Sequence, residues 1–431
     1  MGLIASSVFK QTPSQLGVEL LADLLADYPT CNFQVRLWDG SSLGSYHPRF
    51  TLLLKHPSAL REMFLSPTEL TLAESYIFDD LDITGDIEAA FEVAEHLLTK
   101  SNRGLVQSLH LASALRKLPL NQETRPRHRT AMLLGSAHSK DRDRQAISFH
   151  YDLPPEFFGL WLDKRMVYSC AYFTAAEDSD LDAAQCRKLD YICRKLRLRR
   201  GDCLLDIGCG WGGLLIHAAT HYGVQALGIT LSVRQAEVAR QRIRDASLEG
   251  ACRVEVCDYR DLEPGRQFDK IVSVGMFEHV GEAQLPEYFS LVWQLLRPGG
   301  VFVNSGIAAC ATDHRQGLSF IDRYVFPDGE LVPLNTSLGV AERSGFEIRD
   351  VESLREHYAL TLNHWVRRLE AHAEQARQIT DETTYRIWRL YMAASAHRFR
   401  SARLNLYQML LAKPLNGQSS MPLTRADWYR D

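Results

Sequence analysis

Asp206 and the glycines that follow it are the first residues of this chain whose types and spacing could do chemistry. Residues 204–213 read LLDIGCGWGG, a short apolar run followed by a glycine-dense turn. Because glycine has no Cβ, Gly208, Gly210 and Gly212 let the backbone approach a ligand that a side chain would keep away. The apolar run predicts a buried parallel strand, and the turn after such a strand lies at the edge of an α/β sheet where ligands bind. We therefore expect a ligand site at this turn.

Two ligand classes compete for the turn. Gly208, Gly210 and Gly213 match the G-x-G-x-x-G pattern of dinucleotide sites, but that use needs an acidic residue about 20 positions later. The second predicted strand ends over residues 226–232 without an acid. The pattern D-x-G-x-G-x-G, which begins at Asp206, fits better and is typical of S-adenosylmethionine-dependent methyltransferases. A nucleotide enzyme and a Rossmann-like fold without a ligand are the alternatives.

Polar residues follow the next two predicted strands. Thr230 and Gln235 come just after the second strand and are polar enough to replace the missing ribose-binding acid. Asp258 and Tyr259 end the third strand, where adenine would lie, and offer an acceptor for its amino group and an aromatic wall. The simpler alternative for Asp258 is a cap on the next turn.

Glu278 ends a further strand. Residues 272–281 read VSVGMFEHVG, so the glutamate follows an apolar run directly and would lie beside the sulfonium group. A lone glutamate after a strand usually faces solvent. The apolar run before it makes a functional role for Glu278 the better interpretation.

Alternating strands and helices surround these residues, which is the pattern of a parallel sheet covered by helices on both faces. After a strand at 346–354, two helices precede a last strand from residue 404, so that a helical insertion over 355–400 could form a lid. The other strands are expected near 225–230, 253–258, 268–275 and 300–307, and the helices near 211–222, 232–247 and 284–296.

The remaining segments differ in character. Residues 1–118 predict a separate, mainly helical α+β domain, which includes a helix followed by a turn over 70–86; scaffold, lipid docking and dimer contact are all open roles for it. Residues 119–146 are charged and contain proline, as linkers do. Residues 147–413 form the second domain, and 414–431 predict a mobile tail.

Composition excludes several classes of function. The net charge of −4 gives little support to nucleic-acid binding. Nine cysteines include no CxxC pair and are odd in number, which argues against a disulfide framework or a zinc site and favours a reducing cytoplasm. No metal site is expected. No apolar run approaches the ~18–20 residues that a membrane span needs.

Five stretches together resemble the cyclopropane fatty acid synthase family. The match covers about residues 147–413, and parts of the first 118 residues resemble the N-terminal domain of longer bacterial members. The resemblance implies an α/β fold: a Rossmann-like class I methyltransferase domain with a mostly parallel seven-stranded sheet and a helical lid, preceded by a smaller, mainly helical domain. The stretches are His150-Tyr151-Asp152, Tyr168-Ser169-Cys170-Ala171-Tyr172, residues 205–213, Asp258-Tyr259-Arg260-Asp261 and residues 274–281.

The resemblance implies methyl transfer from S-adenosylmethionine to the double bond of an unsaturated acyl chain in a membrane phospholipid. Attack of the alkene on the sulfonium methyl group leaves a carbocation, which aromatic faces such as those of Tyr168 and Tyr358 can stabilise. A base then removes a proton and the cyclopropane ring closes. We expect a cytoplasmic homodimer bound peripherally to the inner membrane surface. Basic and apolar residues of the lid, among them Arg386 and Arg389, suit such an interface, and an ordinary solvated helix face is the equal alternative.

In the family the base is a bound bicarbonate. The motifs place it at Cys170, Glu278, Ile307 and Tyr358, and they place Tyr168 and Ser169 beside the cofactor, together with Asp206, Gly208, Gly210, Gly212, Thr230, Gln235, Asp258 and Tyr259. Ser305 stands where the family has a histidine, and a hydroxyl cannot carry an imidazole's charge. This difference leaves ring closure open. The alternatives are another C-methylation of the lipid, which gives a methylene- or methyl-branched chain, a small-molecule methyltransferase, and a non-catalytic lipid- or cofactor-binding protein.

Overall fold

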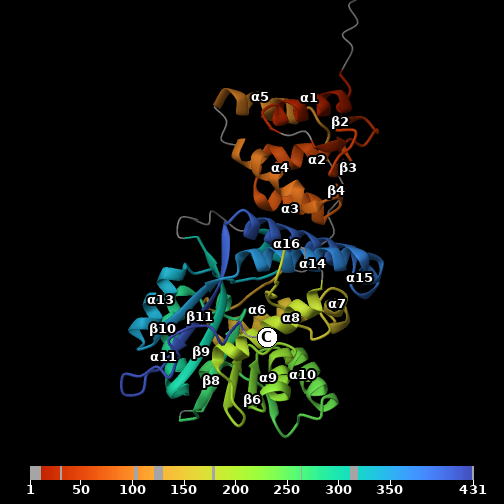
Figure 1. Ribbon diagram of the computed structural model, residues 1–431. Coiled ribbons are helices and arrows are strands. Elements are labelled where there is room, and N and C mark those ends of the chain that lie inside the picture. Colours follow the sequence, from red (N-terminus) through yellow and green to blue (C-terminus); the bar gives the residue numbers. More distant parts are fainter. Residues whose placement is uncertain are drawn as a thin grey trace, which may run out of the picture. The chain divides into compact units, whose positions relative to one another are not determined.

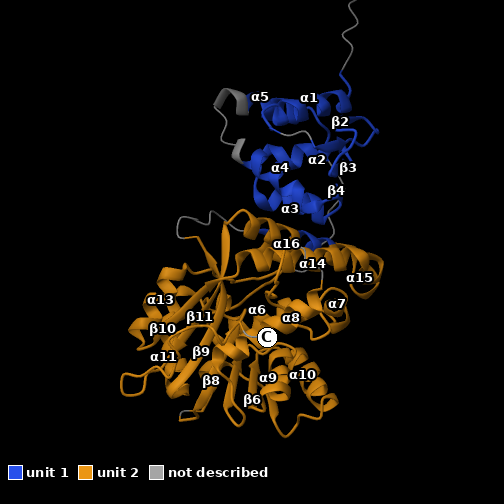
Figure 2. Ribbon diagram, in the orientation of Figure 1, with its two compact units in different colours: residues 1–129, 318–320, 386–390 blue, residues 130–317, 321–385, 391–431 orange. Residues whose placement is uncertain are grey.

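The chain forms two compact units (Figure 2). The first contains residues 1–129 with 318–320 and 386–390, and the second contains the remainder. The boundary near residue 130 falls inside the segment predicted as a linker. The computed structural model describes residues 11–29, 32–100, 105–120, 130–176, 180–263, 265–310 and 319–429.

The first unit packs helices against a small sheet with strand order β2-β1-β3-β4, in which β1 and β3 are parallel. Apolar side chains such as Leu20, Phe33 and Phe50 fill its core. The elements are α1 (Pro13–Leu25), β1 (Phe33–Arg36), β2 (Ser42–Gly44), β3 (Phe50–Leu54), α2 (Pro57–Leu65), α3 (Glu69–Ile77), β4 (Leu81–Gly85), α4 (Ile87–Lys100) and α5 (Leu105–Leu115).

Strand β4 corrects the prediction of a helix followed by a turn over 70–86. The helix ends at Ile77, and Leu81–Gly85 then pairs antiparallel with β3 and buries Leu81 and Ile83. The segment Leu81–Gly85 is too short to show the alternation of a strand clearly, and its partner β3 lies almost 30 residues earlier. Asp86 accepts a hydrogen bond from the Ala89 backbone N–H at 3.2 Å, as expected of a residue that caps α4.

The second unit is built on a seven-stranded sheet with the order β10-β11-β9-β8-β5-β6-β7. Neighbouring strands from β9 to β7 are parallel, and β11 is antiparallel to both of its neighbours. The strand order reverses at β5, and a ligand site is expected at the carboxyl end of such a strand. The strands are β5 (Cys203–Ile207), β6 (Gln225–Thr230), β7 (Cys252–Val256), β8 (Phe268–Val274), β9 (Leu296–Ala309), β10 (Glu347–Ser353) and β11 (Leu404–Ala412).

Helices cover both faces of this sheet (Figure 1). One buried cluster joins Ile192, Leu215 and Ala239 to the sheet, and a second cluster joins Phe289 and Ala341 to it. This layering confirms the predicted Rossmann-like α/β fold. The helices are α6 (Lys140–Tyr151), α7 (Pro155–Gly159), α8 (Leu181–Leu196), α9 (Gly213–Tyr222), α10 (Val233–Asp245), α11 (Leu285–Leu295), α12 (Phe320–Tyr324), α13 (Leu334–Arg343), α14 (Arg355–Ala371), α15 (Ala373–Ile379) and α16 (Glu382–Arg400).

Two segments predicted as irregular are ordered by long-range ion pairs. Helix α6 begins inside the predicted linker 119–146, and its Arg142 pairs with Asp328. The predicted mobile tail 414–431 packs against the sheet unit as far as the structure describes it, because Trp428 is buried and Arg425 pairs with Asp350 at 2.5 Å. Neither partner is near in sequence, so local composition could not show these contacts. Residues 121–129 lie outside the described residues.

Candidate active site

The glycine turn between β5 and α9 leaves one side of its backbone open. Gly208, Gly210 and Gly212 all have positive φ, at +85°, +54° and +80°. A Cβ on Gly208 would lie 2.8 Å from Met276 Cβ, so this glycine is required by a close approach. A Cβ on Gly210 would meet nothing within 4 Å. The space beside Gly210 therefore belongs to a cavity that can take a ligand.

That cavity brings together nearly all the residues predicted to bind the cofactor. It lies at the carboxyl ends of β5, β6, β7 and β8, with Met166–Ser169 and part of α6 on its other side. A cavity at the reversal point of a parallel sheet is the expected place for a nucleotide-like ligand. The predicted residues that line it are Tyr168, Ser169, Asp206, Gly208, Gly210, Thr230, Gln235, Asp258 and Tyr259.

Gly212 is the one residue of the predicted cofactor set that lies outside the lining of this cavity. It is the N-cap of α9, and a Cβ there would lie 3.2 Å from Ala239 Cβ on α10. The third glycine thus serves helix packing, a role that the sequence pattern alone does not separate from ligand contact.

Asp206 and Lys188 both line the cavity, and their charges interact. Burial raises the pKa of Asp206 to about 7, and the nearby Lys188 opposes that rise. Burial lowers the pKa of Lys188 to about 8. The sequence interpretation missed Lys188. A signal existed, because Lys188 stands at helical spacing between the buried residues Ala184 and Ile192 of α8.

Thr230 and Gln235 form a polar pair at the end of β6. The Thr230 hydroxyl donates to Gln235 Oε1 at 2.9 Å, and the Ser232 backbone N–H donates to Thr230 Oγ1 at 3.1 Å. This pairing fixes the orientation of the Gln235 amide group, because its oxygen accepts the Thr230 hydroxyl. Tyr151 from α6, which the predicted site did not include, lines the cavity beside Gln235.

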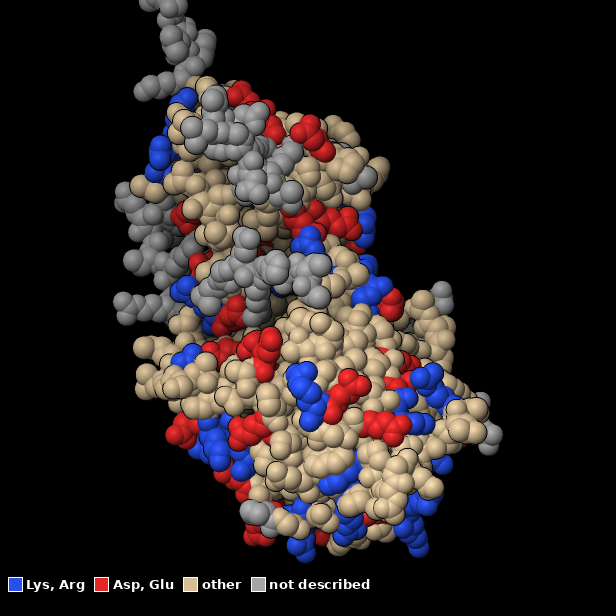
Figure 3. Space-filling view, turned by 90° about the vertical axis from the view of Figure 1, so that its left-hand side faces the viewer, with Lys and Arg blue, Asp and Glu red and all other residues tan. Residues whose placement is uncertain are grey.

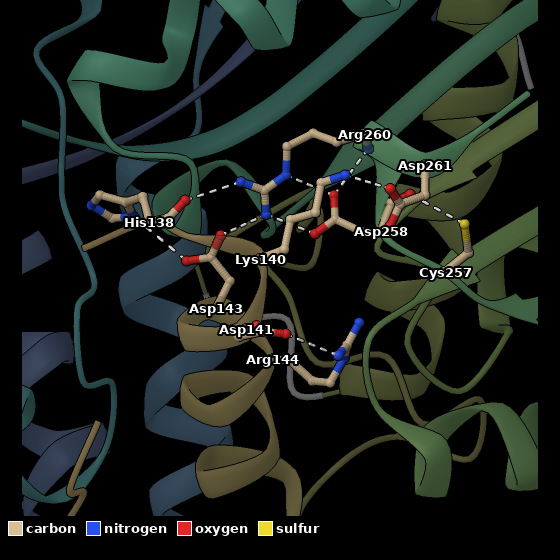
Figure 4. A network of polar contacts seen from close by, with 9 residues as sticks. All are labelled: His138, Lys140, Asp141, Asp143, Arg144, Cys257, Asp258, Arg260 and Asp261. Carbon is tan, nitrogen blue, oxygen red and sulfur yellow. Dashed lines mark hydrogen bonds and ion pairs between the residues drawn. The ribbon is translucent and has the colours of Figure 1, made fainter. Parts of the chain in front are cut away.

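Asp258 belongs to a network of polar contacts in which Arg260 joins several residues (Figure 4). Arg260 donates to both carboxylate oxygens of Asp258, at 2.8 and 2.6 Å, and also to Asp143 of α6 at 2.7 Å. The Arg260 backbone N–H donates to Asp258 Oδ1 at 2.9 Å, so the alternative of a turn cap holds as well. Through Arg260, Asp258 therefore joins helix α6 to the part of the cavity that follows β7, a link that the sequence did not reveal.

Glu278 does not line this cavity. It makes a direct hydrogen bond to Ile307, another residue of the predicted catalytic set. Its Oε1 accepts the Ile307 backbone N–H at 2.7 Å, while its Oε2 is buried with no partner among the described residues. Burial raises the pKa of Glu278 to about 7, and the Ile307 hydrogen bond opposes the rise. A buried carboxyl group near neutrality with a free oxygen is equipped to accept a proton.

Three of the other predicted catalytic residues, Cys170, Ser305 and Tyr358, are buried, and Ile307 is partly buried. Tyr358 interacts electrostatically with both Glu278 and Cys170. Burial raises the pKa of the Cys170 thiol to about 12, so this cysteine is a neutral packing group and not a thiolate nucleophile. Ser305 is buried on β9, and its backbone oxygen accepts the Gly275 N–H at 2.9 Å. None of these residues lines the cofactor cavity itself.

Aromatic rings surround Tyr168, between the cavity and Tyr358. The Tyr168 ring lies 5.2 Å from Trp365, which lies 6.1 Å from Tyr358. The Tyr168 and Tyr391 hydroxyl oxygens are 3.3 Å apart. Such ring faces attract a cation electrostatically.

A family model described as mycolic acid cyclopropane synthetase matches residues 138–409. The chain belongs to this family. Residues 20–102 match a second model, a domain of unknown function. With the relatives below, this membership makes the chain an S-adenosylmethionine-dependent methyltransferase of the cyclopropane synthase family.

Relatives and solved structures agree with that membership. The chain is 41% identical over 404 residues to a probable fatty acid methyltransferase of Pseudomonas putida, covering 92% of this chain and 96% of the relative. It is 37% identical over 264 residues to the cyclopropane-fatty-acyl-phospholipid synthase of Escherichia coli, covering 61% and 66%. The crystal structure of the mycolic acid cyclopropane synthase CmaA1 with SAH and CTAB matches 62% of this chain and 97% of its own, with a TM-score of 0.59 and 33% identity.

The residues present fit S-adenosylmethionine. Gly210 leaves open space where a Cβ would otherwise stand, and Asp206 accepts no hydrogen bond from the described residues. Gln235 offers an amide group, and Tyr259 a ring wall. When bound, the cofactor supplies an electrophilic methyl group on sulfur. Bicarbonate stays a prediction: Ile307, one of the residues expected to hold it, donates its N–H to Glu278, and Ser305 stands where the family has a histidine.

Proposed function

We propose that the protein transfers a methylene unit from S-adenosylmethionine to the cis double bond of unsaturated acyl chains in membrane phospholipids and forms a cyclopropane. The observation that carries this proposal is Glu278, a buried carboxyl group with one unpartnered oxygen, set beside the cofactor cavity and near aromatic rings. The relatives named for fatty acid methylation and for cyclopropane synthesis support a lipid acyl chain as the acceptor.

The chain's residues would act mainly by positioning and by electrostatics. An alkene is a weak nucleophile, so holding it against the methyl group must supply much of the acceleration. As the new C–C bond forms and the methyl–sulfur bond breaks, positive charge passes to the acyl chain. The rings of Tyr168, Tyr358 and Trp365 would stabilise that charge. Burial excludes water, which would otherwise add to the carbocation.

Glu278 would then take a proton from the added methyl carbon, and the electron pair left behind would close the ring. Its Oε2 is free to receive that proton, and the Ile307 N–H holds Oε1 in place. Bicarbonate enters no step of this proposal.

A second outcome is C-methylation of the same lipid to a methylene- or methyl-branched chain. Ser305 favours it, because the hydroxyl cannot carry the positive charge of the histidine that the family has at this position. The name of the Pseudomonas putida relative, a probable fatty acid methyltransferase, is consistent with either product.

Membrane contact belongs to the same proposal. In the described residues no helix is both long and apolar enough to cross a bilayer. On the face shown in Figure 3, basic and acidic side chains are interspersed. Arg386 and Arg389 do not support the basic interface predicted for the lid, because both are buried and contact Tyr76 within the first unit. We therefore propose surface binding that depends more on apolar contact with the acyl chain than on lipid charge.

The deciding experiment incubates the protein with labelled S-adenosylmethionine and vesicles of an unsaturated phospholipid, with and without added bicarbonate. We expect label in the acyl chains and the upfield proton signals of a ring methylene in the NMR spectrum. Vinylidene proton signals would establish the methylene-branched product instead. Vesicles of a saturated phospholipid are the matched control, and label there, or in no lipid at all, contradicts the proposal.

A further inference from the structure

Lys188 is a fully buried lysine whose side chain borders the cofactor cavity. It lies on α8 among apolar residues, and its ammonium group donates a hydrogen bond to Ser169 Oγ at 2.8 Å. An ammonium group has three N–H donors. This is the one hydrogen bond that Lys188 makes within the described part of the chain, so two donors remain unused. A buried charge is costly unless it is paired, so the arrangement is suited to an anion.

The charged groups near Lys188 leave one counterpart available. Asp163 is occupied, because its oxygens accept the backbone N–H groups of Arg165 and Val167 at 2.9 and 2.8 Å. The thiol of Cys170 is neutral, since burial raises its pKa. Asp206 lines the same cavity and accepts no hydrogen bond from any described residue. The cavity thus presents one cation and one anion, both buried and both with unused bonding capacity.

The amino-acid end of S-adenosylmethionine carries the complementary pair of charges. Its α-carboxylate is the only anionic group of the molecule, and its α-ammonium lies on the adjacent carbon. Ribose and adenine are neutral at pH 7. A zwitterion therefore matches a buried lysine and a buried aspartate in the sign of their charges, whereas no other part of the cofactor calls for a cation.

We propose that Lys188 binds the α-carboxylate of S-adenosylmethionine, with the Ser169 hydroxyl beside it, while Asp206 receives the α-ammonium. Ser169 accepts a hydrogen bond from Lys188, which leaves the hydroxyl proton free to point to the same carboxylate. Lys188 then fixes the register of the cofactor in the cavity and so the direction of its methyl group. This inference depends on the cofactor and is independent of the lipid acceptor.

Calorimetric titration with two ligands tests the proposal without turnover. S-adenosylhomocysteine carries both charges, and its decarboxylated analogue keeps the amino group but lacks the carboxylate. In Lys188→Met, we expect the affinity for S-adenosylhomocysteine to fall roughly 10- to 100-fold, as for loss of a charged hydrogen bond. The affinity for the analogue should stay the same. An equal loss for both ligands, or no loss for either, overturns the proposal.

Lys195→Met is the matched control. Lys195 is a second buried lysine of α8, but it donates to Gln408 Oε1 at 3.0 Å and to Glu352, and it does not line the cavity. We expect this variant to be less stable and yet to keep the ratio of the two affinities. A changed ratio in Lys195→Met would show that loss of any buried lysine on α8 is enough, and would count against a specific contact.

A pH series on the unaltered protein gives a test that does not depend on a variant's folding. Because burial lowers the pKa of Lys188 to about 8, its charge is lost between pH 7 and pH 9. The preference for S-adenosylhomocysteine over the analogue should fall about tenfold across this range. A flat preference overturns the proposal. Failure of the unaltered protein to bind either ligand would instead contradict the cofactor assignment itself.

Discussion

Burial of Glu278 raises the pKa of its carboxyl group, which suits it to accept a proton but lowers the stability of the protein when the group is ionised. Its folded-state pKa, about 7, lies above the ordinary 4.5 because the carboxyl group is buried. The folded protein therefore binds more protons than the unfolded chain between these values, and stability falls as the pH rises through this window. Glu278 therefore lowers the free energy of unfolding least below about pH 4.5, where it is protonated in both states, and most above about pH 7, where it is ionised in both.

The variant Glu278→Gln should separate the two roles of this residue. Gln cannot lose a proton, so we expect it to be more stable than the unaltered protein at pH 8, by about 3 kcal/mol at most, and close to it at pH 5. Turnover should fall by ~100-fold or more, since the proton acceptor is lost. Thermal melting at both pH values and S-adenosylhomocysteine binding provide the measurements.

The exposed residue Glu282, four positions later, supplies the control. Glu282→Gln should leave both the melting temperature and the turnover unchanged. Equal stability of Glu278→Gln and the unaltered protein at pH 8 would show that the buried carboxyl group carries no such cost.

At the scale of elements, the turn between β5 and α9 leaves room for a ligand because Gly210 has no Cβ. Gly210→Ala places a methyl group in the open space of the cavity, so binding of S-adenosylhomocysteine should fall more than about tenfold. The positive φ should cost stability by about 1–2 kcal/mol. Gly201→Ala is matched, because Gly201 also has positive φ and open space around it but does not line the cavity. It should lose similar stability and keep full binding; equal binding by both variants would contradict the assignment.

Helix α6 depends on Arg260. Replacing Arg260 with Met leaves Asp258 buried without its cation and leaves Asp143 with His138 alone, which should destabilise the second unit by about 3 kcal/mol. Hydrogen exchange should accelerate in α6, and binding of S-adenosylhomocysteine should weaken. Arg144→Met on the same helix is the control, because its pair with Asp141 is exposed and should contribute about 0.5 kcal/mol or less. Unchanged exchange in α6 of Arg260→Met would exclude this anchoring role.

The sequence predicted those elements whose cause is local. The strand and the glycine turn at Asp206 follow from an apolar run and from residues without Cβ. The strand that carries Thr230 and the strand that ends just before Asp258 follow from the alternation of strands and helices. Helix α6 could not be predicted, because Arg142 finds Asp328 only after 186 residues. Lys188 was missed for a similar reason: helical spacing shows that it is buried, but only the packed structure shows what it faces.

At the scale of the whole molecule, known proteins cover the chain to different extents. The Pseudomonas putida relative matches 92% of this chain, whereas the CmaA1 structure matches 62% of it. The first unit has its own core and its own sheet, and the cofactor cavity is lined entirely by residues of the second unit. The roles predicted for the first unit, lipid docking or contact with a second copy in a homodimer, thus involve surfaces other than the cofactor cavity.

Hydrogen exchange of the full chain can assign that role. S-adenosylhomocysteine should slow exchange at the glycine turn and at the end of β6 in the second unit, and leave β1–β4 unchanged, because a ligand protects the structure that it stabilises. If the first unit docks on lipid, phospholipid vesicles should then slow exchange in it, whether the acyl chains are saturated or unsaturated, although only unsaturated chains accept a methyl group. If it joins two copies instead, protection should appear without vesicles as the protein concentration rises, together with a doubled mass in light scattering. Protection of β1–β4 by S-adenosylhomocysteine alone would contradict the separation of roles, because it would couple the first unit directly to the cofactor.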